Sequence, residues 1–174
     1  MKTAKKITAL LIVLTLLFAL SATAFAFNSE TQYRIKFFVN GTEQNSWEAI
    51  GNVGESVYTA IINKHGNNAH FNNIIGTSNY ALNGMYNTYS NPSSTAPAAY
   101  PSATAVPGHT GYFLIETGDD GYHYVYAGYD WTYHFEGGSD LWLYMNQCFP
   151  AANDVIEVVY SLQVTDWWSE DPIT

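Results

Sequence analysis

The last third of the chain alternates large apolar or aromatic residues with other residues over several short stretches. In one of them Tyr122, Tyr124 and Tyr126 fall on one side of the alternation, and His123 and Val125 fall on the other. Because successive side chains of a strand point to opposite faces of a sheet, this two-residue period predicts strands rather than helices. The chain is therefore expected to build a sheet that has an aromatic face.

Turn residues mark where the alternating stretches end, and so predict the order of the strands along the chain. Asn40-Gly41 ends a first stretch at Tyr33 to Val39, because this dipeptide favours a tight hairpin turn. Thr42 to Ile50 then return as a second strand that places Trp47 near the core. Later strands are predicted at residues 112–116, 122–126, 131–135, 141–145 and 155–162, with turns at 118–121 and 137–138.

One stretch has the period of an amphipathic helix. Val57, Ala60 and Ile61 fall on one helical face, directly after Gly54-Glu55-Ser56. An acidic residue before the first turn and basic residues in the last turn suit the helix dipole, and Gly66 ends the segment. A single short helix after a hairpin predicts an α+β fold in which the helix packs on a mostly antiparallel sheet.

The middle of the chain is rich in Asn, Ser, Pro, Ala and Gly from residue 67 to residue 111. Prolines recur in its second half, from Pro92 to Pro107. Because proline removes a backbone donor and disfavours helix in the preceding residue, residues 90–111 are predicted as an extended loop. The sequence leaves open whether this loop is functional or a packed surface excursion.

The amino terminus has the three parts of a secretory signal peptide. Lysines between Lys2 and Lys6 precede an uncharged apolar run from Ile7 to Leu20, and the small-residue pattern Ala24-Phe25-Ala26 follows. We expect a signal peptide at residues 1–26 that is removed after Ala26. A retained anchor is the alternative, since the apolar stretch nearly reaches the roughly 20 residues that span a bilayer.

Residues 27–174 are expected to form a single secreted domain, extracellular and either free or at the cell surface, with no stable membrane span. The chain has 15 Asp and Glu against 6 Lys and Arg. Three of the six cations lie in the predicted signal peptide, so the remainder carries a formal charge of 3 − 15 = −12. Nucleic acid is not an expected partner, because phosphate binding needs clustered cations.

Motifs of catalysis or metal binding are not found in the sequence. The five histidines lack tight metal spacing, and there is no Gly-x-Ser-x-Gly elbow or phosphate-binding glycine loop. Asp119-Asp120 is interpreted as a hairpin turn rather than a calcium site. A metal site between His123 and His134 on adjacent strands and a carboxylate pair for glycoside hydrolysis are the alternatives. We expect neither an enzyme nor a cofactor.

Cys148 is the single cysteine, so no intramolecular disulfide is available. It has no basic neighbour in sequence that would favour the thiolate, and a buried thiol is expected. An intermolecular disulfide is the alternative.

Aromatic side chains are the main resource for recognition, with 14 Tyr and 5 Trp in a chain that is only 12% charged. Tyr and Trp offer rigid, amphipathic contact area that suits sugar faces, flat ligands and protein surfaces. Residues 163–174 are predicted as an acidic tail that contains Trp167 and Trp168. The residues expected to bind a ligand are Trp131, Tyr133, Trp142, Tyr144, Tyr122, Tyr124 and Tyr126.

Three segments resemble a known family. Asp140 to Asn146 and Asn153 to Tyr160 are similar to the W-x-Y-x-N and G-D-x-I-E-W-x-Y strands of the transcobalamin-type carboxy-terminal domain, common in secreted bacterial proteins. Gly54 to Ile61 resembles the family's helix entry, G-x-T-V-x-D-A-L. In this chain Gln147, Asn153 and Val158 stand where the family usually has Gly, Gly and Trp.

The resemblance implies a β-grasp-like fold and, in the transporters of the family, contact with cobalamin. The leading hypothesis is a secreted, non-enzymatic domain that binds a cobalamin-like compound or a glycan through a Tyr- and Trp-rich sheet face. The alternative is a structural subunit of an extracellular filament or surface layer, in which copies of the chain assemble through sheet edges.

Overall fold

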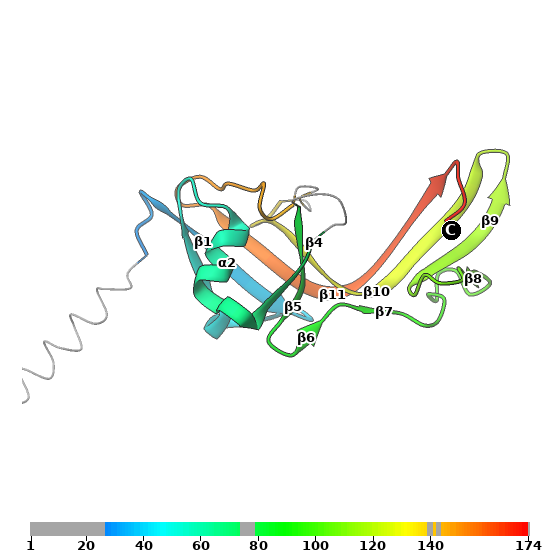
Figure 1. Ribbon diagram of the computed structural model, residues 1–174, viewed down its shortest axis with the longest axis horizontal. Coiled ribbons are helices and arrows are strands. Elements are labelled where there is room, and N and C mark those ends of the chain that lie inside the picture. The colour runs from blue at the N-terminus through cyan, green and yellow to red at the C-terminus, as the bar shows by residue number, and fades with distance from the viewer. Residues whose placement is uncertain (1–26, 74–78, 139–140, 142–143, 174) are drawn as a thin grey trace, which may run out of the picture.

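A computed structural model describes residues 27–73, 79–138, 141 and 144–173. It has a body, in which a helix covers one side of a sheet, and an arm that projects from it (Figure 1). We define the arm as residues 91–127 and 161–173, and the body as the other described residues. Two 15-residue strands, β10 (Gly121–Phe135) and β11 (Val155–Ser169), run through both parts.

The main sheet has the strand order β2-β1-β11-β10-β9-β8. β1 and β11 are parallel, and the other pairings are antiparallel, including those of β3 with β1 and β7 with β10. The chain is thus mostly β with one short helix, as predicted for an α+β protein. The remaining strands of this sheet are β1 (Gln32–Val39), β2 (Thr42–Glu43), β3 (Ala49–Asn52), β7 (Asn91–Pro92), β8 (Thr104–Ala105) and β9 (Tyr112–Gly118).

The first hairpin forms at the predicted turn. Asn40 and Gly41 have φ angles of 49° and 79°, the left-handed values that a tight hairpin turn needs. The predicted return strand at residues 42–50 is instead split into β2 and β3 by the 3-10 helix η1 (Asn45–Trp47). This break brings the Trp47 ring onto Tyr86, at 5.0 Å between centroids, which a straight strand on β1 would not do.

The predicted helix is confirmed as α2 (Val57–His65). The Ser56 hydroxyl accepts a hydrogen bond from the Thr59 N–H, the usual N-cap interaction, and Gly66 ends the helix with φ 53°. Val57, Ala60 and Ile61 are buried, as their spacing predicted. A short 3-10 turn, η2 (Gly66–Asn68), then leads into β4.

The core of the body lies between α2 and one face of the sheet. Tyr33, Ile35 and Phe37 of β1 are fully buried, because alternate residues of this strand point toward the helix. Ile156 and Val158 of β11 lie beside them. Burial of such side chains contributes about 1.5–3 kcal/mol each.

A second, three-stranded sheet forms where the sequence indicated only a change in composition. Its strands are β4 (Ala69–Asn73), β5 (Tyr80–Met85) and β6 (Thr88–Tyr89). Leu82 and Met85 of β5 add to the core. The strands are short and rich in Asn and Ala, so they lack the β-branched alternation by which strands are recognised.

The two long strands differ from the prediction. β10 joins the segments predicted at 122–126 and 131–135, and its register with β11 is unbroken from Tyr122 and Ser169 to Phe135 and Ile156. Residues 163–169 are therefore part of a strand, not of a tail, and of the described residues only 170–173 follow it. Gly128 permits this continuity, because a Cβ there would meet the backbone of β7.

The strand predicted at 141–145 is not formed by its described residues, Leu141, Tyr144 and Met145. The backbone of this segment binds the helix instead: the Met145 carbonyl accepts from Tyr58 N–H at 3.1 Å, and the Cys148 carbonyl accepts from Val57 N–H at 3.0 Å. These carbonyls satisfy the first N–H groups of α2, which have no partner within the helix.

The predicted loop at 90–111 is a packed excursion that contributes β7 and β8. Ala96, Tyr100 and Ala103 pack on Phe113, Val125 and Ala127, the small core of the arm. The loop therefore covers the arm as α2 covers the body.

His65 provides a test of the core. Its Nε2–H donates to the Trp47 carbonyl at 2.8 Å, so the neutral ring accepts at Nδ1 from the Tyr86 hydroxyl at 3.2 Å. Burial lowers the pKa of His65 below 6.5, so protons favour the unfolded chain and stability is lost as pH falls from 6.5. We expect His65→Gln to reduce the loss of unfolding free energy between pH 7 and pH 5, measured by urea denaturation. An unchanged pH slope would contradict this assignment.

Candidate functional site

Five aromatic residues form one face of the arm. Tyr122, Tyr124 and Tyr126 alternate along β10, and Trp167 of β11 and Tyr112 of β9 lie opposite Tyr124 and Tyr126 in the sheet. Directly opposite residues of antiparallel strands share a face, so the five rings lie side by side. Ring centroids are 5.3 Å apart for Tyr112 and Tyr126 and 5.9 Å apart for Trp167 and either Tyr112 or Tyr124. We call these five residues the aromatic face.

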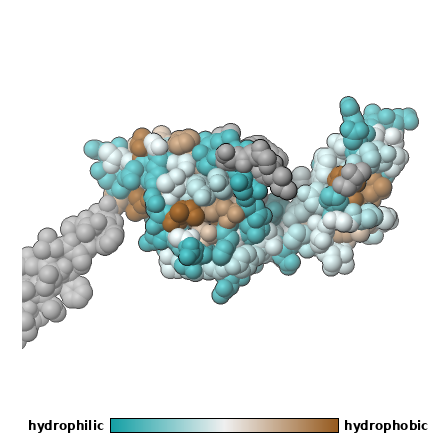
Figure 2. Space-filling model, viewed as in Figure 1, coloured by the Kyte–Doolittle hydropathy of each residue, from teal (hydrophilic) through white to brown (hydrophobic). Residues whose placement is uncertain are grey.

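The aromatic face is partly covered by the end of the chain. The Ile173 N–H donates a hydrogen bond to the Tyr124 hydroxyl at 3.0 Å, and Tyr124 is only 3% exposed. The other four rings are half-buried and open to solvent on one side. Apolar residues are visible on the arm as well as on the body in Figure 2. An aromatic surface outside the main core is thus available for contact.

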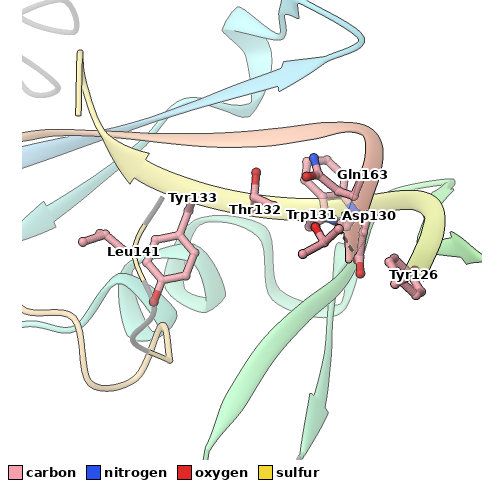
Figure 3. A pocket seen from close by; sticks show the side chains of 8 residues that line it. Tyr126, Asp130, Trp131, Thr132, Tyr133, Leu141 and Gln163 are labelled. Atoms are coloured by element: carbon pink, nitrogen blue, oxygen red, sulfur yellow. Dashed lines mark hydrogen bonds between the residues drawn. The ribbon is translucent and has the colours of Figure 1, made fainter. Parts of the chain in front are cut away.

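A pocket of about 280 Å³ adjoins this face where the arm meets the body (Figure 3). Tyr126 and Thr165 belong to its wall in the arm, and Thr132 of β10 belongs to its wall in the body. Hydroxyl, carboxylate and amide groups therefore lie next to the exposed rings. The full lining is Tyr126, Asp130, Trp131, Thr132, Tyr133, Leu141, Gln163 and Thr165.

Asp130 fixes the geometry of this pocket. Its Oδ1 accepts from the Ser90 hydroxyl at 2.5 Å and from the Trp131 N–H at 2.8 Å. Burial raises the pKa of Tyr126 to about 12, and the nearby Asp130 carboxylate adds to this shift. The Tyr126 hydroxyl therefore keeps its proton at neutral pH and can donate a hydrogen bond in this pocket.

The opposite face of the arm has one polar cross-link. The His123 ring stacks on Trp168 at 4.6 Å, and its Nε2–H donates to Asp166 Oδ2 at 2.9 Å. The hydrogen bond from His123 lowers the pKa of Asp166 below its usual value of 3.8. Glu116 lies 3.5 Å from the second ring nitrogen. This cross-link joins three strands of the arm.

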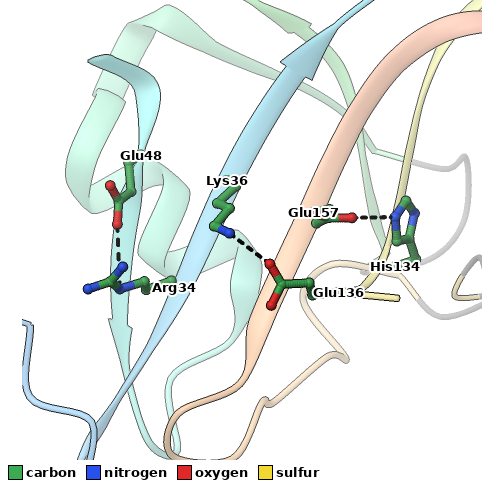
Figure 4. A network of polar contacts seen from close by, with 6 residues as sticks. All are labelled: Arg34, Lys36, Glu48, His134, Glu136 and Glu157. Carbon is green, nitrogen blue, oxygen red and sulfur yellow. Dashed lines mark hydrogen bonds and ion pairs between the residues drawn. The ribbon is translucent and has the colours of Figure 1, made fainter. Parts of the chain in front are cut away.

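The open face of the body is charged and internally paired (Figure 4). Lys36 Nζ lies 2.8 Å from Glu136 Oε1, and Arg34 Nε lies 3.7 Å from Glu48 Oε1. His134 Nε2 is 2.9 Å from Glu157 Oε2. Two of the three cations in residues 27–174 are thus paired within the chain, so this face is not arranged for binding anions.

The structure places the predicted ligand-binding residues in different surroundings. Tyr122, Tyr124 and Tyr126 share a face, as the alternation predicted. Trp131 and Tyr133 are each 8% exposed and belong to the core of the body, so their rings offer little surface to a ligand. Tyr144 is half-buried in the body, apart from the aromatic face, and Trp142 lies outside the described residues.

Sequence reasoning missed Tyr112 and Trp167. Trp167 falls in the predicted tail at residues 163–174, although the alternation of Val155 to Leu162 continues through Val164 to Trp168 and forms one strand. Tyr112 was recognised as a strand residue, but its face depends on the register of β9 with β10, which contains a bulge at His123 and Tyr124.

Other candidate sites have structural explanations. Asp119-Asp120 forms the two-residue turn between β9 and β10. His123 and His134 lie on the same strand, in the arm and the body, so they do not meet across adjacent strands. Cys148 is buried, as expected, and burial raises the pKa of its thiol. Among the described residues no group of three His, Cys, Asp or Glu side chains is placed to hold a metal.

Comparisons with known proteins found no matching family model, no similar curated protein and no similar solved structure. Within the part of the chain that the structure describes, no helix has the length and apolar character needed to cross a membrane.

The cross-link of the arm can be tested by hydrogen exchange. The pKa of Asp166 is lowered in the folded chain, so its stabilising effect is present above pH 3.8 and is lost as pH falls through the folded value. We expect Asp166→Asn to speed hydrogen exchange of arm amides at pH 6. The measurement is residue-resolved hydrogen exchange by NMR, with the amides of β1 as internal control. Equal protection of the arm in both proteins would contradict the assignment.

Proposed function

We propose that the protein is a secreted, non-enzymatic binding protein whose aromatic face binds a glycan. The observation that carries this proposal is the row of half-buried rings at Tyr112, Tyr122, Tyr126 and Trp167, outside the core and next to a polar pocket. Aromatic rings accept the apolar faces of flat ligands, and rigid Tyr and Trp side chains lose little entropy on binding.

The polar groups beside the rings support a sugar ligand. Gln163, which is half-buried, and Thr165, which is exposed, lie on the same side of β11 as Trp167, because all three are odd-numbered residues of one regular strand. A sugar ring presents an apolar face for stacking and hydroxyls at its rim for hydrogen bonds. A neutral glycan also suits a chain whose residues 27–174 carry a formal charge of −12.

We also propose that the body is a β-grasp-like relative of the transcobalamin-type domain. A hairpin, one helix and a final strand parallel to β1 support this reading. Asn153, which stands where the family has Gly, has φ 67°, a left-handed conformation that Asn tolerates. A cobalamin-like compound is therefore the second ligand to test.

The alternative function is a structural subunit whose copies assemble through sheet edges, as in a filament or surface layer, and one observation favours contacts through a sheet edge. Residues 161–169 of β11 pair with β10 on one side only, so the main sheet has an open edge in the arm.

Adjacent tryptophans on opposite faces allow a matched test of ligand binding. We expect Trp167→Ala to weaken binding by about tenfold or more, because a buried aromatic contact typically contributes over 1 kcal/mol. Trp168→Ala removes a ring from the opposite face of the same strand and should leave the affinity within about twofold. Binding is measured by isothermal titration calorimetry against a glycan panel and cobalamin.

The proposal predicts heat from at least one glycan that depends on Trp167. Binding of cobalamin alone would favour the family ligand instead. Absence of heat across both sets, or equal effects of the two tryptophan variants, would contradict the aromatic face as a binding site.

A further inference from the structure

The arm has an unpaired backbone edge. β1 pairs with β11 only as far as Val39 opposite Tyr160, and the Asn40 N–H then donates to the Tyr160 carbonyl at 2.8 Å. From residue 161 to residue 169, β10 lies on one side of β11, and no described strand lies on the other. This edge is nine residues long, more than the length of a typical strand.

The hydrogen bonds between the strands show which backbone groups of β11 face the open edge. The Tyr160 carbonyl faces β1, whereas the Val155 carbonyl accepts from the Glu136 N–H on the β10 side. Backbone groups of successive strand residues point to alternate sides, and the β10–β11 register has no shift. The N–H and C=O groups of Leu162, Val164, Asp166 and Trp168 therefore face the open edge.

The side chains of this edge lack the usual protection against pairing. Leu162, Val164 and Trp168 are 55%, 44% and 45% exposed. Proline, lysine and β-bulges commonly block the pairing of edge strands. Residues 161–169 contain no Pro or Lys, and their register with β10 has no bulge. Their only charge, Asp166, is hydrogen-bonded to His123.

We propose that this edge binds a second copy of the chain, so that two β11 strands pair antiparallel about a two-fold axis at Thr165. The inference does not depend on the glycan proposal. It identifies which edge of the sheet is used, which occupant it takes and in which register.

The register follows from hydrogen bonding and charge. Outward-facing residues must lie opposite each other, which places Leu162 opposite the second copy's Trp168 and Val164 opposite the second copy's Asp166. An axis at Asp166 would set two carboxylates opposite each other. An axis at Val164 would require Tyr160, whose carbonyl is already bonded to β1. The axis at Thr165 uses the whole free edge.

The distribution of charge favours the antiparallel arrangement. Acidic residues gather at the tip of the arm, at Asp119, Asp120, Glu170 and Asp171. Antiparallel pairing puts each tip beside the start of the second copy's arm, so the two acidic tips lie apart. Parallel pairing of the same edges would bring them together at a cost in repulsion.

Symmetry makes this contact self-limiting. Each copy offers the same patch to the other, so the contact closes as a dimer and does not propagate into a filament. In this register Gln163 lies opposite the second copy's Trp167, and both side chains point to the side of the sheet that carries the aromatic face. The aromatic faces of the two copies therefore join into one surface. Nine residues a side is a small interface, and we expect a dimer at micromolar concentrations.

Charge substitution tests the register. The full-length chain is expressed in a secreting host, and the secreted protein is studied by sedimentation equilibrium from about 1 to 500 μM, a range that brackets weak association. Val164→Asp sets a carboxylate opposite the second copy's Asp166 and should raise the dimer dissociation constant by about tenfold or more. Val164→Lys, at the same position, sets a cation there and should leave dimerisation equal or stronger.

Disulfide trapping locates the axis. In the proposed dimer the two copies of Thr165 form a non-hydrogen-bonded pair, whose Cα atoms lie about 4.5 Å apart, close enough for a disulfide. Thr165→Cys should form a covalent dimer under mild oxidation. Gln163→Cys, two residues along the same face, lies opposite the second copy's Trp167 and should remain monomeric on a denaturing gel.

Several results would overturn the proposal. These are a monomer at every concentration, a dimer equally strong with Val164→Asp, growth into larger assemblies, or a Gln163→Cys disulfide in preference to Thr165→Cys. Failure of glycan binding alone would leave the dimer intact, so the two proposals are separable. Circular dichroism of each variant checks that the fold is retained.

Discussion

The unbroken ladder between β10 and β11 is the interaction on which the rest of the structure depends. At one end its residues enter the core beside α2, and at the other they carry the aromatic face. No turn or shift interrupts the pairing where body and arm meet. The positions of Tyr122, Tyr124, Tyr126 and Trp167 in the arm are therefore set by two strands that are also fixed in the body.

One face of this two-stranded ladder is covered in both parts of the molecule, by different elements in the body and in the arm. In the body Trp131 and Tyr133 belong to the core that α2 helps to form, and in the arm the Pro-rich loop packs on Val125 and Ala127. The other face is salt-bridged in the body and aromatic in the arm, where the end of the chain covers it only in part, at Tyr124. The same two strands thus provide a scaffold on one side and a surface for contact on the other.

The sequence predicted those features that depend on local pattern. The Asn40-Gly41 turn, the helix at Val57–His65 and the shared face of Tyr122, Tyr124 and Tyr126 each follow from spacing and turn chemistry. Features that depend on tertiary contact were missed. Trp131 lies in the core where its ring meets those of Trp47 and Tyr160, and the length of β11 depends on β10 continuing beside it.

The arm is also the part of the molecule that has the smaller core of its own. Its own core consists of three buried residues and the loop residues around them, far fewer than in the body. A cluster of this size stabilises little alone, so the arm is held by its backbone ladder and by the His123–Asp166 cross-link. Any molecule that binds only the folded arm adds its binding free energy to this small stability. A ligand on the aromatic face and a second copy on the β11 edge would therefore each stabilise the folded arm.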